Sequence, residues 1–297
     1  MNKSFKTSIG GQALIEGVMM KGPSKTAIAV RKPNGEINLK VDPNFSISDK
    51  YPIFKLPILR GAVKLIEAMV IGLKAMTYAA SFWDDDEGEE LSAKEIGGTL
   101  FLSVLLAVGF FILLPNLLAS LFQKYTDSIL ILNIAEGILR IVVFFFYLVY
   151  ISKIDDIYRV FQYHGSEHKS IHCYEHGEDL TIENVQKYPC EHPRCGTSFL
   201  FMVLFVSIIV LSFFGWPNPL LRVVIRIALF PLIAGLAYEV NRWVAKSDSM
   251  LSKILIKPGL YIQKIATVKE PQPDQIEVAI TSLKAVLPEE GEDDRWI

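Results

Sequence analysis

The sequence predicts a mainly α-helical, polytopic membrane protein with four spans, a small N-terminal β-hairpin and an interfacial amphipathic helix. Two observations predict this fold class. Of the 297 residues, 51% are apolar and only 21% are charged, which is unlike a soluble globular domain. The mean hydropathy is +0.33 although the chain carries 30 basic and 32 acidic side chains, so the apolar residues must be concentrated in blocks. Blocks of that kind are typical of membrane spans.

Four apolar stretches are long enough to cross a bilayer: residues 97–122, 129–151, 197–216 and 219–240. The first and third contain no charged residue. The second contains Glu136 and Arg140, and the fourth contains Arg222, Arg226 and Glu239. Because an isolated charge in lipid is costly, we expect Glu136, Arg140 and Arg226 to form a charge-paired contact between the second and fourth spans. A polar pathway and snorkelling side chains are the alternatives.

The distribution of lysine and arginine predicts the orientation. Residues 1–96 carry 13 of them, the 152–196 segment carries 5 and the tail from residue 241 carries 8, whereas the connections 123–128 and 217–218 carry 1 and 0. Positive residues accumulate on the cytosolic side of membrane proteins. We therefore expect a multi-pass protein of the cell membrane, with both termini and the 152–196 segment in the cytosol.

The cytosolic regions are predicted to be 1–96, 152–196 and 241–297, separated by the span pairs 97–151 and 197–240. Residues 26–31 and 36–41 flank Pro33-Asn34-Gly35, a turn sequence that predicts the β-hairpin. Residues 57–82 have helical amphipathic spacing, and we expect this helix to lie flat in the cytosolic interface. A helix packed in a cytosolic domain and a fifth span are the alternatives.

The last cytosolic region is expected to contain one short helix, residues 274–287, followed by a frayed acidic tail, residues 289–294. The acidic run 84–90 is expected to solvate a turn. These soluble pieces could pack together beneath the membrane.

The charge and cysteine content restrict the function. A net charge of −2 gives no basic field for a phosphate backbone, so we expect no nucleic-acid partner. The three cysteines lie between Cys173 and Cys195, and an odd number so close together suits a metal site or reduced thiols better than a disulfide framework.

All five histidines fall within 29 residues. The motif H-x-x-E-H occurs twice, beginning at His164 and at His172. Residues four apart on a helix share a face, so His164 and His168 can bind one divalent metal ion, and Glu167 can orient a water on that metal and accept its proton. This is the arrangement of the inverted zincin motif. Metal binding without catalysis and a solvated histidine-rich surface are the alternatives.

The remaining candidate ligands are Glu175, on the same predicted helix, and His192 and Cys195, which precede the third span. A soft thiolate ligand makes zinc or iron better candidates than magnesium, and zinc is the expected ion. One shared site requires a bend or a flat helix between residues 152 and 163, because a straight helix from the second span would carry His164 about 20 Å from the bilayer.

Long motifs occur at residues 10–20 (GGQALIEGVMM), 164–169 (HGSEHK) with 174–175 (YE), 192–199 (HPRCGTSF) and 238–239 (YE). Together they resemble the YqhQ-like family of bacterial membrane proteins. The resemblance runs along nearly the whole chain. It implies a metal-dependent enzyme, and it assigns family positions to His164, Glu167, His168, Glu175, His192, Arg194 and Cys195. His172, His176, Cys173 and Cys190 lie outside the family motif.

Taken together, these patterns predict a hydrolase at the cytosolic membrane surface. His164, His168 and either Glu175 or His192 would hold the metal, Glu167 would be the general base, and Arg194 would stabilise developing negative charge. Glu16 is a supporting candidate as a further ligand or base, and its segment either folds against the histidines or forms a plain turn. Glu239 is a supporting candidate because its depth in the membrane is close to that of the histidine site. A site at the membrane surface suggests a lipid-linked or membrane-protein substrate. A non-catalytic metal-binding protein, such as a sensor, transporter or scaffold, is the alternative.

Overall fold

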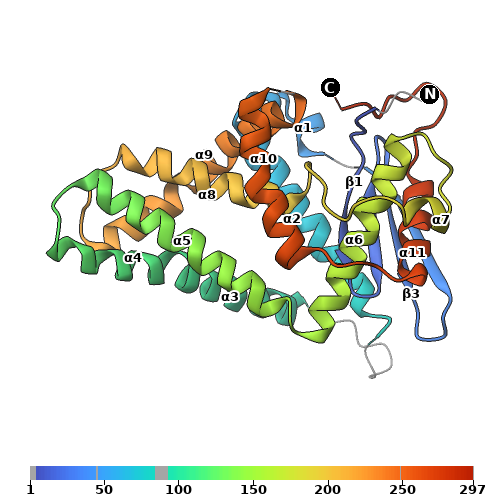
Figure 1. Cartoon of the computed structure of the whole chain (residues 1–297), viewed down its shortest axis with the longest axis horizontal. Coiled ribbons are helices and arrows are strands. Elements are labelled where there is room, and N and C mark those ends of the chain that lie inside the picture. The colour runs from blue at the N-terminus through green and yellow to red at the C-terminus, as the bar shows by residue number, and fades with distance from the viewer. Residues whose placement is uncertain (1–4, 45, 84–92, 248, 297) are drawn as a thin grey trace.

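A computed structural model of the chain describes residues 5–44, 46–83, 93–247 and 249–296. The expected acidic turn at residues 84–90 lies outside these residues. The molecule has two parts (Figure 1): a β-sheet with its covering helices at one end, and a group of long apolar helices that extends to the other end. The chain is mainly helical, as the composition predicts.

The sheet has four antiparallel strands in the order β1-β2-β3-β4, namely β1 (Gly10–Leu14), β2 (Gly17–Lys21), β3 (Lys25–Arg31) and β4 (Ile37–Pro43). The predicted hairpin is confirmed as β3 and β4, and Gly35 has φ +87° in its turn. The sequence pattern does not predict β1 and β2, because two adjacent glycines at the start of β1 weaken the strand signal.

Helices cover both faces of the sheet. Helix α2 (Leu59–Ala80) packs Ala75 and Ala79 against one face. Helices α6 (Asp155–Glu175) and α11 (Pro273–Ala285) cover the other face, where the buried side chains include Tyr163, Ile171 and Leu283. Helix α11 corresponds to the predicted C-terminal helix, so the N-terminal and C-terminal regions share one core.

The expectation that the acidic tail is frayed is wrong. The Oγ1 of Thr7 donates a hydrogen bond of 2.6 Å to the Oδ2 of Asp294, and both residues are buried. Thr7 also forms an antiparallel bridge with Arg295, and the N–H of Trp296 donates to the carbonyl of Lys6. The two ends of the described chain therefore lie side by side, which repeated acidic residues alone did not predict.

Among the described residues, three helical segments are long and apolar enough to cross a membrane: 101–124, 129–151 and 219–246. The first comprises most of α3 (Ala93–Val108), a π-helical turn (Gly109–Leu113), α4 (Leu114–Ser120) and a 3₁₀ turn (Leu121–Lys124). Helix α3 begins eight residues before this apolar segment. The others are α5 (Ile129–Ile151) and α9 (Pro219–Lys246). The predicted span 197–216 is helical only over α8 (Gly196–Ser212), which is shorter than the other three.

The predicted charge-paired contact between the second and fourth apolar segments is present. Arg140 donates to Glu136 at 2.7 Å along α5, and Arg226 of α9 forms an ion pair with the other oxygen of Glu136. A second hydrogen bond of 3.2 Å joins Arg140 to Ser207 of α8. All of these side chains are buried, so the contact ties three helices together through groups that would be costly to expose to lipid.

Two charged side chains of α2, Arg60 and Glu67, are directed toward the protein. Arg60 donates to Glu239 of α9 at 2.6 Å, and Glu67 accepts a hydrogen bond of 3.0 Å from Ser46, which caps the short helix α1 (Ile47–Lys50). The apolar Ile66 and Met69 are 56% and 62% exposed. Two charged groups of α2 therefore bind the protein, while part of its apolar surface faces outward.

The chain turns sharply between α5 and α6 (Figure 1), as one shared site requires. Ser152 ends α5, and the extended conformation of Ile154 starts α6. Gly165, in the middle of α6, does not produce this turn; it allows the backbone of Lys269 to approach closely. Four further segments of the described chain are helical: a 3₁₀ turn (Pro52–Lys55), α7 (Ile182–Val185), α10 (Met250–Ile262) and a π-helical turn (Gln263–Thr267).

Candidate metal centre

Helix α6 carries both H-x-x-E-H motifs. Asp155 and Asp156 lie in its first turn, where negative charge interacts favourably with the helix dipole and stabilises the helix. Gly177, with φ +68°, follows the end of the helix. The loop after α7 brings His192, Arg194 and Cys195 back to this helix. Cys195 then caps α8, because its Sγ accepts a hydrogen bond of 3.4 Å from the N–H of Thr197.

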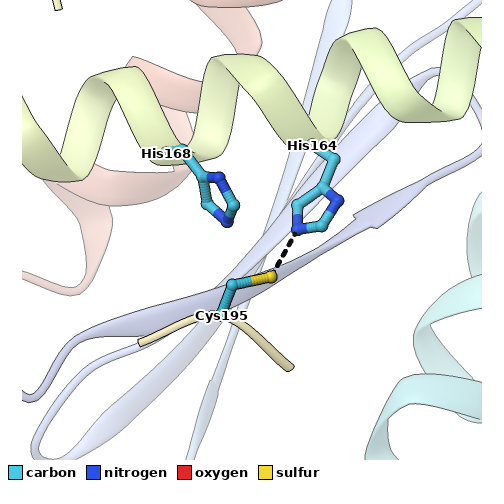
Figure 2. Close-up of side chains that lie close together, drawn as sticks. All are labelled: His164, His168 and Cys195. Atoms are coloured by element: carbon cyan, nitrogen blue, oxygen red, sulfur yellow. Dashed lines mark hydrogen bonds between the residues drawn. The ribbon is translucent and has the colours of Figure 1, made fainter. Parts of the chain in front are cut away.

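One group of metal-binding side chains consists of His164, His168 and Cys195, whose potential ligand atoms lie within 4.8 Å of one another. Figure 2 shows both imidazole rings extending from α6 toward Cys195. The Sγ of Cys195 lies 3.2 Å from the Nε2 of His164, and the two ring centroids are 4.4 Å apart. Two imidazole nitrogens and a thiolate are a donor set that suits zinc.

Backbone carbonyls orient the two rings. The Nδ1 of His164 lies 2.8 Å from the carbonyl oxygen of Thr267, and the Nδ1 of His168 lies 2.5 Å from that of Cys190. A carbonyl can only accept, so each Nδ1 carries the proton and each Nε2 keeps its lone pair. Such hydrogen bonds fix metal-binding histidines in the required tautomer.

A second group consists of His172, Glu175 and His192, again with potential ligand atoms within 4.8 Å. In this group Arg194 forms an ion pair with Glu175, and its guanidinium lies 3.3 Å from the Nε2 of His192. A bound cation would have to displace this guanidinium. The first group needs no such displacement, so it is the better candidate for a metal.

Glu167 lies on the same helix and its side chain is buried. Its Oε1 accepts a hydrogen bond of 3.0 Å from the N–H of Gly11, and its Oε2 is buried without a hydrogen-bond partner in the described part of the chain. Burial raises the pKa of this carboxyl to about 7, and the nearby Cys195 contributes in the same direction. A carboxyl group with a pKa near neutrality can both accept and return a proton.

The other titratable groups are also shifted. Burial lowers the pKa of His168 to about 4 and holds that of His192 well below 6.5. Burial alone would raise the pKa of the Cys195 thiol, but His168 and the N–H of Thr197 outweigh it, so the pKa lies below 9. Neutral imidazoles and an accessible thiolate are the forms that bind metals.

A pocket of about 580 Å³ opens beside these groups. Its wall includes Glu167 and the first group of ligands from one side, residues 8–12 from β1 and the preceding segment, and Lys64, Glu67, Ala68 and Ile71 from α2. Volumes of this size are typical of small-ligand and substrate sites. The candidate metal centre is therefore open to a substrate.

The structure separates the predicted ligands into two groups rather than one. Glu175 and His192 join His172, which lies outside the family motif, and Arg194 pairs with Glu175 in this second group. The H-x-x-E-H repeat could have indicated His172. Gln263 also went unrecognised: its side chain accepts from the N–H of His192 at 2.8 Å and donates to its carbonyl at 3.0 Å, holding the loop in place.

Glu16 and Glu239 lie outside the centre. Glu16 lies in the β1–β2 turn with φ +49° and binds Arg159 and the hydroxyl of Tyr163. Glu239 binds Arg60. The segment around Gly11 does form a wall against α6, as the sequence analysis considered. His176 is exposed, and its Nδ1 lies 2.7 Å from the carbonyl of His172 in its own helix.

Comparisons with known proteins identify a family whose model covers most of the chain. Residues 56–289 match the family described as "Protein of unknown function (DUF1385)". The chain is 35% identical over 301 aligned positions to the "Uncharacterized protein YqhQ" of Bacillus subtilis (strain 168), covering 94% of this chain and 92% of that protein. No solved structure matches the chain.

Proposed function

This chain belongs to the YqhQ-like (DUF1385) family of proteins, and we propose that it is a metal-dependent hydrolase that acts at the cytosolic surface of the bacterial cell membrane. The observation that carries the proposal is the convergence of His164, His168 and Cys195 beside the buried Glu167, at the edge of an open pocket. A zinc site with three protein ligands leaves a coordination position for chemistry.

The residues present fit a divalent zinc ion. His164 and His168 would each offer Nε2, because their Nδ1 atoms are engaged by carbonyls. Cys195 would offer its thiolate, which the hydrogen bond from the N–H of Thr197 favours. When bound, zinc would supply Lewis acidity toward a substrate carbonyl or phosphoryl oxygen.

The protein's own groups have distinct roles in this proposal. Glu167 accepts a proton from the attacking water and returns it to the leaving group, since its carboxyl is buried at the edge of the pocket and its Oε2 has no hydrogen-bond partner in the described part of the chain. Arg194 stabilises negative charge that develops on the substrate, and Glu175 positions its guanidinium.

The finer membrane arrangement is part of the proposal. We place both termini in the cytosol with four spans, α8 being the third, because it packs along α9 and begins at the candidate centre. We place the outward apolar face of α2 in the cytosolic interface, since Ile66, Met69 and Val70 are exposed there. A substrate that is lipid-linked or part of a membrane protein fits this location.

The test is the metal content of the detergent-purified protein, measured by elemental mass spectrometry. We expect near-stoichiometric zinc in the wild type, loss of zinc in His168→Ala and Cys195→Ala, and retention in His172→Ala. His176→Ala is the matched control, because it removes an exposed histidine of the same helix. Thermal unfolding of each variant checks that loss of metal is not loss of fold.

Other outcomes would redirect the proposal. Zinc retained in Cys195→Ala but lost in His172→Ala would assign the metal to the second group. If Glu167→Gln keeps its zinc and the wild-type cellular phenotype, the non-catalytic alternative, a sensor or transporter, would be favoured over a hydrolase.

A further inference from the structure

Within the described residues β1 is an edge strand with an open side, because β2 is its partner on the other side and the sheet order ends with β1. The hydrogen-bonding direction of its residues can be derived from the neighbouring strand. The carbonyl of Glu16 and the N–H of Gly22 bond toward β3, so Gly17, Met19 and Lys21 point toward β1. Their partners on β1 are Leu14, Gln12 and Gly10, which leaves Ile9, Gly11 and Ala13 directed outward.

This edge borders the pocket of the candidate metal centre. Ile9, Gly10 and Gly11 line the pocket, and a Cβ added at Gly10 would meet no atom within 4 Å. Helices α2 and α6 cover opposite faces of the sheet. The part of the pocket that lies beside β1 is therefore a slot with α2 as one wall and α6 as the other. A further strand beside β1 would therefore lie between α2 and α6, along the row of His164, Glu167 and His168.

One hydrogen bond connects the edge to the proposed general base. The N–H of Gly11 points outward and donates to the Oε1 of Glu167, which fixes Glu167 relative to anything paired with β1. In the described part of the chain, the carbonyl oxygens of Ile9 and Gly11 have no hydrogen-bond partner. They are two residues apart, which is the repeat of an extended polypeptide.

We infer that the substrate is an extended polypeptide segment that pairs with the open edge of β1, its N–H groups donating to the carbonyls of Ile9 and Gly11. This inference rests on the proposed hydrolase function and specifies its substrate class. Strand addition to a free edge is a common mode of peptide recognition, in which backbone bonds supply affinity. The slot would present the peptide's carbonyl groups to the candidate metal centre.

The charges around the slot favour a peptide over a phosphorylated ligand. Both signs are present: Lys21 and Lys64 are balanced by Asp49 and Glu67 on the same pocket wall. Hydrolysis then breaks one amide C–N bond and consumes one water molecule. The water oxygen joins the carbonyl carbon, Glu167 takes the water proton and passes it to the leaving nitrogen, and the products are a carboxylate and an amine.

The first experiment identifies the class of bond that is cleaved. The full-length metal-loaded protein in lipid nanodiscs is incubated with peptides from a digested bacterial proteome, and new termini are found by mass spectrometry, with Glu167→Gln as the control. Parallel reactions contain p-nitrophenyl acetate and bis-p-nitrophenyl phosphate.

Each result has a defined meaning. Peptide cleavage by the wild type but not by Glu167→Gln supports the inference. Hydrolysis of the ester or the phosphodiester in a Glu167-dependent manner, with no peptide cleaved, overturns the peptide inference and leaves the hydrolase proposal standing. No hydrolysis of any probe by protein that holds its metal would count against both.

The second experiment tests pairing with β1 and needs no variant that might misfold. A cleaved peptide is synthesised with single backbone N-methyl groups at successive positions, which remove one N–H donor each. We expect two sensitive positions, two residues apart, each with about a three- to tenfold loss in kcat/KM that comes mainly from KM. Either of two results would overturn the pairing. In the first, N-methylation is tolerated equally at every position away from the cleaved bond. In the second, adjacent positions are sensitive and the two-residue repeat is absent.

Discussion

At the scale of single residues, the candidate centre depends on hydrogen bonds from segments that are far apart in the chain. The carbonyls of Thr267, Cys190 and Glu191 orient His164, His168 and His172 respectively. A histidine that could otherwise adopt either tautomer is thus held with one nitrogen free. The H-x-x-E-H motif identifies which side chains can bind a metal, but these carbonyls determine which of their atoms can do so.

Asp294 gives a residue-scale prediction. Its carboxylate accepts a hydrogen bond of 2.6 Å from the buried Thr7, so Asp294→Ala leaves that hydroxyl only the 3.3 Å contact with the backbone carbonyl of residue 294. We expect the free energy of unfolding to fall by about 1–3 kcal/mol. The measurement is thermal or denaturant unfolding of the detergent-solubilised protein.

The neighbouring Asp293 is the matched control. It pairs with Arg295 on the surface, and exposed pairs of this kind contribute little. Asp293→Ala should therefore change stability by less than about 0.5 kcal/mol. Equal stability of the two variants would contradict a structural role for the tail.

At the scale of secondary-structure elements, the contact between α2 and α9 positions one wall of the pocket. The backbones approach closely where Gly235 of α9 meets Ile58, the residue that precedes α2 and has φ +70°. A β-branched residue in that conformation is strained, so the surrounding contacts must hold it. Glu239 contributes by binding both Arg60 and the N–H of Ile58.

Gly235→Ala tests this contact. The added Cβ would collide with the carbonyl oxygen of Ile58, and backbone cannot move aside as a flexible side chain can. We expect a loss of about 1–3 kcal/mol in stability, measured by thermal unfolding. In Gly98→Ala the Cβ meets no atom within 4 Å, so stability should be unchanged or slightly higher. If both variants unfold alike, the close approach is not stabilising.

At the scale of the whole molecule, the turn between α5 and α6 joins an apolar helical part to a sheet that carries the candidate centre (Figure 1). The buried Glu136, Arg140 and Arg226 connect the helices in the first part, and α11 completes the core of the second. Because α2 packs on both the sheet and α9, the two parts share an extensive contact.

Accessibility of introduced cysteines tests the orientation of the whole chain. With four spans, a membrane-impermeant maleimide added to intact cells should label Asp127→Cys and Asn218→Cys, but label Glu290→Cys only after permeabilisation. If α8 does not cross the membrane, Asn218→Cys would be protected and Glu290→Cys labelled from outside. The wild type, whose cysteines all lie between Cys173 and Cys195, controls for background labelling.

The sequence by itself determined the features that arise from local pattern. Apolar length predicted α5 to the residue, turn chemistry predicted the β3–β4 hairpin, and helical spacing placed His164 and His168 on one face. These features follow from interactions between residues close in sequence.

The tertiary structure alone decided which distant groups meet. In the folded chain Cys195 lies in one group of candidate ligands, and Glu175 and His192 lie in the other, where Arg194 pairs with Glu175. Asp294 accepts a hydrogen bond from Thr7. The tertiary structure also placed β1 as an open edge beside Glu167. Contacts of this kind depend on how whole elements pack, and no periodicity within a single segment encodes which partner an edge or a carboxylate will find.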